Sequence, residues 1–138
     1  MKAVKLLLEK GEIDKDIVLL LDEMHLQQEE SYQGGETVGR AENGKLYKGV
    51  LNFMIVGIRK NVPFVVRAVP EVTVNGGLVR KHIDGVLQDL HETGFNVRTI
   101  VADNHKSNVA AYESLMRDYH RVDKETKAIV HPSSNRKI

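Results

Sequence analysis

The sequence contains no cysteine, and only 5% of its 138 residues are aromatic. Without cysteine the chain can form neither disulfides nor cysteine-ligated zinc sites. The low aromatic content argues against a platform for single-stranded nucleic acid, on which successive bases stack on aromatic rings. No apolar run approaches the roughly 18 residues that a transmembrane helix needs, so we expect no membrane partner.

A dominant charge of one sign is also lacking. Twenty Lys and Arg residues oppose 19 Asp and Glu residues, which leaves a formal net charge of +1. This balance neither indicates nor excludes nucleic-acid binding, because a binding domain can carry only a local basic stripe. What is present is a globular composition, 41% hydrophobic, in a chain long enough for one domain with a real core.

Three β-branched apolar segments in the first half of the chain predict strands. The continuous run Ile17–Leu21 suits a strand buried on both faces. Residues 50–58 and 62–69 are joined by a short polar connection, which favours a hairpin. Pro63 and Pro70 place the second hairpin strand at a sheet edge, because proline cannot donate a hydrogen bond to a neighbouring strand.

The second half of the chain alternates helix and strand. Apolar residues recur at helical spacing from Leu78 to Leu90, and Gly94 follows as a stop signal. Another strand is expected over 97–102, and then a helix with Ser107 or Asn108 as its N-cap. A right-handed crossover through the first of these helices carries the 97–102 strand to the far side of the first strand. The prediction is an α/β fold whose mixed sheet has the order 3-2-1-4, with helices packed on it.

Asp22 and Asp103 each lie at or just past the C-terminal end of a predicted strand. If these strands are adjacent and parallel, their backbones lie about 4.8 Å apart and both carboxylates emerge at the same end of the sheet. Two such carboxylates repel each other, and Mg²⁺ or Mn²⁺ offsets that repulsion. A pair of these ions can activate an attacking oxygen and stabilise a leaving one in phosphodiester chemistry. The simpler alternative is that each aspartate is a turn or cap residue.

Two blocks around these aspartates resemble the first two catalytic blocks of P-element-type DNA transposases, a family that includes transposon-derived host proteins with a THAP zinc finger. The blocks are IVLLLDEMH at residues 17–25 and IVADNHKSNV at residues 100–109. The segment Tyr47–Gly49 and the pair His131-Pro132 are also similar to that family. The resemblance covers about residues 14–138 and leaves residues 1–13 as an N-terminal helix or linker.

The resemblance implies a ribonuclease H-like catalytic domain that cleaves and joins DNA strands. Its Asp, Asp, Glu triad holds two Mg²⁺ or Mn²⁺ ions, with Asp22 matching the first position and Asp103 the second. The implied partners are the DNA of transposon ends and target, the implied location is the nucleus, and a homo-oligomer is compatible with the family.

Several parts of such an enzyme have no counterpart in the sequence: the third carboxylate, the fifth strand, the last helix, the zinc finger, and the inserted domain that binds GTP in the P-element enzyme. We therefore expect a partial ribonuclease H-like fold that binds Mg²⁺ weakly and cleaves no DNA alone. The alternative is a domesticated or degenerate module that binds nucleic acid or protein without catalysis.

Three other polar features of the sequence give weaker indications of function. Residues 34–41 have the glycine spacing of a P-loop, but Arg40 and Ala41 replace the lysine and the hydroxyl residue of that motif, so a flexible loop is preferred over a nucleotide-binding regulator. The six histidines show no paired-ligand spacing, and only His105 is considered for a substrate contact. Strand alternation sends Glu23 to the face opposite Asp22, where a salt bridge is expected rather than a third metal ligand.

Overall fold

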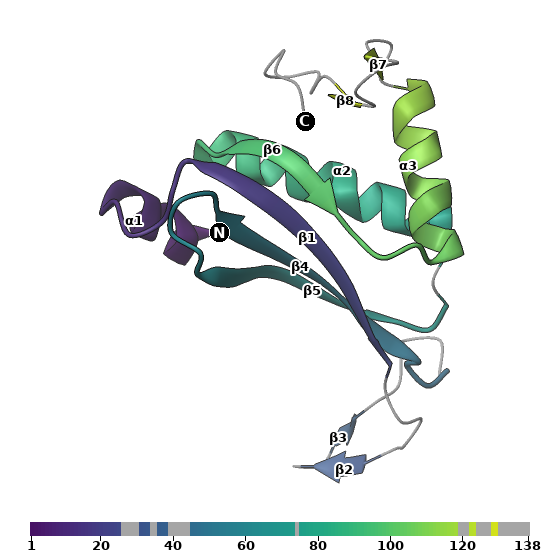
Figure 1. Ribbon diagram of the computed structural model, residues 1–138. Coiled ribbons are helices and arrows are strands. Elements are labelled where there is room, and N and C mark those ends of the chain that lie inside the picture. The colour runs from purple at the N-terminus through teal and green to yellow at the C-terminus, as the bar shows by residue number, and fades with distance from the viewer. Residues whose placement is uncertain are drawn as a thin grey trace.

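The protein, seen here in a computed structural model, is built on a mixed four-stranded sheet with a long helix packed against one face (Figure 1). The structure describes residues 1–25, 31–33, 36–38, 45–73, 75–118, 122–123 and 128–129. The strand order is β5-β4-β1-β6, which confirms the predicted 3-2-1-4 sheet. Its members are β1 (Asp16–His25), β4 (Gly49–Gly57), β5 (Pro63–Glu71) and β6 (Asn96–Val101).

Strand β1 alternates between a buried and an open face. Ile17, Leu19 and Leu21 are at most 5% exposed, whereas Val18 and Leu20 on the opposite face are only half-buried. The expectation of a strand buried on both faces is therefore wrong, and so is the predicted end at Leu21. The strand continues to His25 because its last four residues pair antiparallel with β4.

The hairpin of β4 and β5 is confirmed, with β5 at the edge of the sheet where its prolines predicted it. Pro63 lies opposite Val56 and Pro70 opposite Val50, and the ladder skips one residue on β5 between the partners of Phe53 and Met54. Strand β6 pairs parallel with β1 on the other side of the sheet. The connection from β5 to β6 thus crosses β4 and β1, as the sequence predicted.

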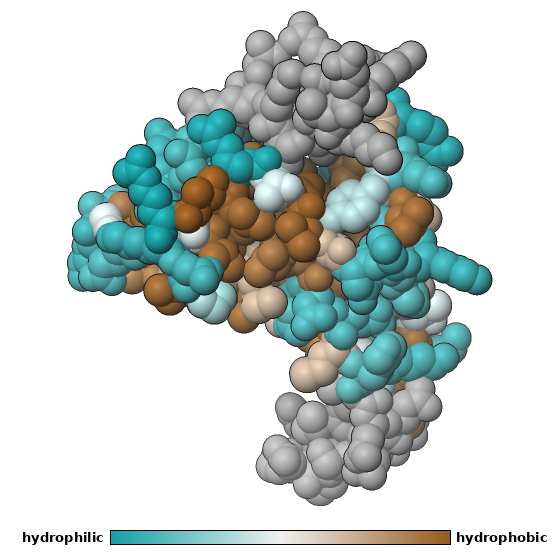
Figure 2. All heavy atoms as spheres, viewed as in Figure 1, coloured by the Kyte–Doolittle hydropathy of each residue, from teal (hydrophilic) through white to brown (hydrophobic). Residues whose placement is uncertain are grey.

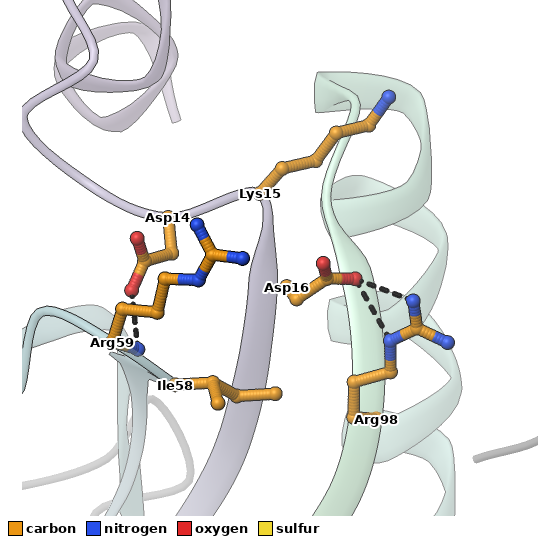
Figure 3. Close-up of a pocket in the computed structure, with 6 residues that line it drawn as sticks. All are labelled: Asp14, Lys15, Asp16, Ile58, Arg59 and Arg98. Carbon is orange, nitrogen blue, oxygen red and sulfur yellow. Dashed lines mark hydrogen bonds and ion pairs between the residues drawn. The ribbon is translucent and has the colours of Figure 1, made fainter.

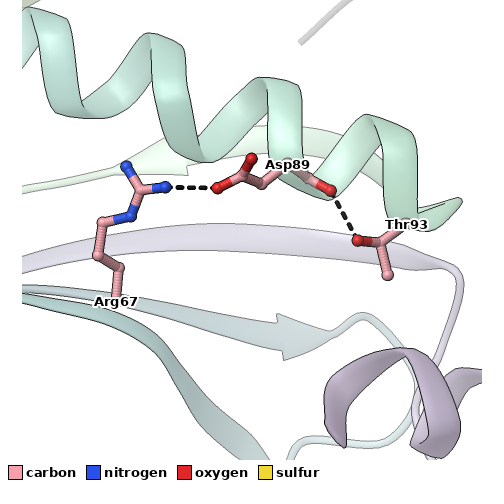
Figure 4. A network of polar contacts seen from close by, with 3 residues as sticks. All are labelled: Arg67, Asp89 and Thr93. Atoms are coloured by element: carbon pink, nitrogen blue, oxygen red, sulfur yellow. Dashed lines mark hydrogen bonds and ion pairs between the residues drawn. The ribbon is translucent and has the colours of Figure 1, made fainter. Parts of the chain in front are cut away.

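Helix α2 (Gly76–Thr93) makes that crossover and covers the buried face of the sheet. The side chain of Asn75 caps it by accepting the Leu78 amide at 2.9 Å, and Gly94 ends it in the left-handed conformation at φ 105°. The guanidinium of Arg67 on β5 passes over Gly85 and pairs with Asp89 of the helix (Figure 4). One edge strand is thereby tied to the crossover helix.

Helix α3 (Lys106–Asp118) packs against α2 through the fully buried Ala111 and Leu115. It begins at Lys106, so both predicted N-caps, Ser107 and Asn108, lie inside the helix, and the ring nitrogen Nδ1 of His105 accepts the amide of Ser107 at 3.4 Å. The expectation of Ser107 or Asn108 as cap is therefore wrong. At the other end of the chain, α1 (Lys2–Glu9) contributes Val4 to the same hydrophobic core.

Two short hairpins complete the described elements. Strands β2 (Ser31–Gln33) and β3 (Glu36–Val38) pair antiparallel, as do β7 (Val122–Asp123) and β8 (Ala128–Ile129). Strands β2 and β3 lie in the hydrophilic, glycine-containing segment 27–48, for which the sequence predicts a loop with one extended segment, so the structure has one strand more than predicted. The P-loop-like Gly34, Gly35, Gly39, Arg40 and Ala41, together with His131-Pro132, lie outside the described residues.

The face of the sheet opposite α2 exposes large apolar side chains. Met24, Val65 and Val101 are 53%, 59% and 47% exposed. Figure 2 shows apolar residues gathered over the sheet at the centre of this view. Among the helices that the structure describes, none combines the length and the apolar character needed to cross a membrane.

Candidate metal centre

Asp22 lies within β1, on the open face of the sheet. It lies three residues before the end of the antiparallel ladder at His25, directly opposite Asn52 of β4. The alternation that buries Leu19 and Leu21 turns Asp22 to the opposite face, and its side chain is exposed. Asp22 is therefore held by strand pairing on a regular backbone rather than by a flexible loop.

Asp103 lies just past the C-terminal end of β6, which pairs parallel with β1. The parallel ladder pairs Leu20 with Val101 as its last partners, and each aspartate comes two residues after its member of that pair. Adjacent, parallel strands were the condition for bringing the two carboxylates together, and the structure confirms both. Asp103 is also exposed, so both carboxylates are accessible from solvent at one end of the sheet.

One oxygen of Asp103 is fixed by two hydrogen bonds. Its Oδ1 accepts the backbone amide of His105 at 3.0 Å and the side-chain Nδ2 of Asn108 at 2.8 Å. Asn108 lies in the first turn of α3 and is only 8% exposed. Sequence reasoning treated Asn108 as a helix cap and missed this contact. The sequence signal for this contact was the spacing, because Asn108 comes five residues after Asp103, in the first turn of the following helix.

The donor atoms suit a hard divalent cation. Carboxylate oxygens are preferred ligands of Mg²⁺ and Mn²⁺, and Mg²⁺ commonly takes one or two carboxylates while keeping waters or substrate phosphates as its other ligands. Asp22 and Asp103 supply such a pair. Within the described part of the chain, no group of three or more Asp, Glu, His or Cys side chains could hold a metal ion. Among the described residues, the chemistry of this carboxylate pair therefore fits an ion with open coordination positions rather than an all-protein cage.

A second acidic cluster lies on the other face of the sheet. Glu23 points to that face as predicted, and near it Glu71 is buried at 6% exposure with His82 of α2 3.3 Å from its Oε1. This approach is not a hydrogen bond, and Oε1 has no hydrogen-bond partner among the described residues. Burial, and then the Glu23 carboxylate, raise the pKa of Glu71; burial, and then Arg67 and Lys81, lower the pKa of His82. We conclude that burial outweighs ion pairing here.

Two of the basic residues near the hairpin and α2 are engaged within the fold. Arg67 pairs with Asp89, and Arg80 binds Asp84 at 2.8 Å and the hydroxyl of Ser114 at 3.0 Å. These guanidinium groups stabilise the packing of α2 on β5 and α3. They are not a free phosphate-binding surface.

A surface pocket lies at the start of β1, away from both aspartates, and Figure 3 shows its lining by Asp14, Lys15, Asp16, Ile58, Arg59 and Arg98. Asp16 accepts hydrogen bonds from Arg98, and Asp14 accepts the backbone amides of Arg59 and Lys60 at 2.7 Å. These two carboxylates hold the strand ends together. The pocket is at the opposite end of β1 from Asp22 and is separate from the candidate metal centre.

Comparison with known proteins agrees with this architecture. The family described as TNP-like, RNase H N-terminal domain matches residues 1–116. A solved structure, the Drosophila P element transposase strand transfer complex, superposes with a TM-score of 0.65 at 21% sequence identity. That match covers 92% of this chain and 26% of the other, so the present chain spans about a quarter of the transposase chain.

A search of curated proteins found no match. The family match spans well over half of the chain, and the structural match shares the ribonuclease H-like fold. The resemblance expected from the two aspartate blocks is thereby confirmed. The chain belongs to the family of TNP-like RNase H N-terminal domains, the N-terminal ribonuclease H-like part of P-element-type transposases.

Proposed function

We propose that this domain supplies two metal-binding carboxylates, Asp22 and Asp103, to a centre that cleaves and transfers DNA strands. The observation that supports the proposal is the parallel register of β1 and β6, in which Leu20 pairs with Val101 and each aspartate follows its member of that pair by two residues. Family membership supports the reaction class, because the matched transposase structure is a strand transfer complex.

In this proposal the residues of the chain bind and orient rather than react. Asp22 and Asp103 hold the cations, and their exposure leaves the remaining coordination positions open to water or to a phosphodiester. When bound, a pair of divalent ions supplies activation of the attacking oxygen and neutralisation of the leaving one. The backbone amide of His105 and the side chain of Asn108 keep one oxygen of Asp103 in place.

We further propose that the 138 residues bind the cation weakly and do not cleave DNA unaided. The support is the donor set, because the described residues offer the two aspartates and no larger ligand cluster. With few protein ligands and high exposure, the affinity depends on water and substrate for the remaining coordination. Incubating the purified chain with duplex DNA and Mn²⁺ tests this, and strand cleavage or joining would overturn it.

A titration with Mn²⁺ followed by two-dimensional amide NMR tests the metal proposal. Paramagnetic broadening is expected to centre on residues next to Asp22 and Asp103. The variants Asp22→Asn and Asp103→Asn keep the side-chain shape but remove the charge, so each should weaken binding. Glu113→Gln, which removes an exposed charge from α3, is the matched control and should leave the titration unchanged. The proposal would be contradicted if the amide signals near both aspartates did not broaden, or if the broadening centred on Glu23 and Glu71.

A second candidate function is binding to a protein or nucleic acid without catalysis. The exposed apolar side chains of Val65 and Val101 on the open sheet face favour it, because the strand register places them in one row across the sheet with Met54 and Leu20. Exposed apolar patches often mark interaction sites, and Figure 2 shows apolar residues gathered over the sheet. The two candidates differ in how they respond to the aspartates. A non-catalytic module binds its partner equally well after Asp103→Asn, and in the presence or absence of Mg²⁺.

A further inference from the structure

Asp103 has two oxygens in unequal surroundings. Both hydrogen bonds that the described residues donate to this carboxylate end on Oδ1, from the His105 amide at 3.0 Å and from Asn108 Nδ2 at 2.8 Å. The side chain as a whole is exposed. The described residues therefore bind one carboxylate oxygen by hydrogen bonds and leave the other accessible to solvent or to a cation.

The donor Asn108 is buried near the contact between α3 and α2. The residue is 8% exposed in the first turn of α3, and the same helix is anchored by the fully buried Ala111 and Leu115. The start of α3 also lies against the start of α2, where Gly76 leaves just enough space for Ala110. This packing restricts displacement of the first turn of α3, which carries Asn108. An exposed carboxylate is thus held by a group that belongs to the core.

The chemistry of this donor suits a carboxylate that must keep its charge. An amide NH₂ donates a hydrogen bond but carries no positive charge, whereas Lys or Arg in its place would neutralise Asp103 and compete with a cation. Groups that hydrogen-bond to metal ligands fix the orientation of those ligands and tune the affinity for the metal.

We propose that Asn108 is a positioning residue, which turns the free oxygen of Asp103 toward a divalent cation shared with Asp22. The inference rests on the proposed function, since it concerns the same site. It adds a residue that acts through Asp103 and does not itself touch the cation. We therefore expect substitutions of Asn108 to change the affinity for the metal independently of the free energy of unfolding.

The test compares Mn²⁺ affinity and urea stability in the full chain. Asn108→Leu keeps the branched shape and removes the donor, and Val109→Ala changes the neighbouring, 40% exposed residue as a control. We expect Asn108→Leu to weaken Mn²⁺ binding by roughly 10- to 100-fold, measured by broadening of the Asp22 and Asp103 amides, and Val109→Ala to leave it unchanged. Wild-type affinity in a folded Asn108→Leu chain would overturn the inference.

A measurement on the unsubstituted protein keeps the test decisive if Asn108→Leu does not fold. During a Mg²⁺ titration, the side-chain NH₂ signals of Asn108 should shift with the same dissociation constant as the Asp103 amide. They should not shift in Asp103→Ala. A response at Asp103 without one at Asn108 would refute the positioning role and leave the metal centre standing. Absence of any response at Asp22 and Asp103 would refute the proposed function, and this inference with it.

Discussion

The contact between α2 and α3 allows a stability prediction with an internal control. A Cβ added at Gly76 would lie 2.6 Å from the Cβ of Ala110, closer than real Cβ atoms approach anything. A Cβ added at Gly77 would meet nothing nearer than Asn75 Oδ1 at 3.5 Å, which is an ordinary contact. Both glycines lie in the first turn of α2, so Gly76→Ala and Gly77→Ala differ mainly in this clash.

The expected free energies follow from two opposing terms. Replacing a helical glycine by alanine gains about 0.5–1 kcal/mol, and both variants share this gain. Overpacking at the helix contact costs about 1–3 kcal/mol, and only Gly76→Ala incurs it. Gly77→Ala should therefore be slightly more stable than the parent chain. Gly76→Ala should have a free energy of unfolding about 1–3 kcal/mol below that of Gly77→Ala.

Urea denaturation followed by circular dichroism measures both variants. The slope of the unfolding free energy against urea should stay constant, so that a shift in midpoint reports stability alone. Equal stability of the two variants would refute the close approach of α2 and α3. It would also weaken the argument that packing against α2 restricts displacement of the first turn of α3, which carries Asn108.

Three further predictions concern the core, a buried acid and a turn. Leu19→Ala should lower the free energy of unfolding by about 2–5 kcal/mol, whereas Leu6→Ala at a 50% exposed position should change it little, as urea denaturation will show. Because the pKa of Glu71 is raised, ionisation of this carboxyl destabilises the fold as pH rises above 4.5. Glu71→Gln should therefore be no more stable than the parent chain at pH 4, and more stable at pH 7 by an amount on the order of 1 kcal/mol in the free energy of unfolding. An equal gain at both pH values would contradict the burial argument. The hydrogen bond from the backbone amide of Lys60 lowers the pKa of Asp14 below 3.8. The ionised carboxylate therefore stabilises the fold above pH 3.8, and this stabilisation is lost as pH falls through the lowered pKa. In thermal melts, the melting temperature of Asp14→Asn should fall less at acid pH than that of the parent chain.

Local pattern was enough to predict the sheet. The apolar run at Ile17–Leu21, the prolines at 63 and 70 and the helical spacing from Leu78 to Leu90 each follow from backbone chemistry that acts within a few residues. Together with crossover handedness they predicted the strand order that the structure shows. The same reasoning predicted neighbouring, parallel strands for Asp22 and Asp103, because strand order decides which strand ends are neighbours.

Contacts between residues distant in sequence were not predictable in this way. Strand β1 extends to His25 because β4 provides pairing partners for its polar last residues, and the polarity of those residues gave no sign of it. Glu71 and His82 meet because β5 and α2 pack together, and neither belongs to a periodic pattern. Asn108 was visible only as a polar residue near a helix start, where capping is the commoner role. Its bond to Asp103 depends on the loop geometry between β6 and α3.

The role of the two aspartates is tested most directly by locating a bound ion. Crystals of the chain grown or soaked with Mn²⁺ can be measured at a wavelength where manganese scatters anomalously. We predict an anomalous peak between Asp22 and Asp103, in contact with the Asp103 oxygen that Asn108 does not hold, and no such peak in Asp103→Asn crystals. A peak at another acidic cluster, or an ordered Asp22 and Asp103 with no peak at saturating Mn²⁺, would contradict the assignment of these residues as metal ligands.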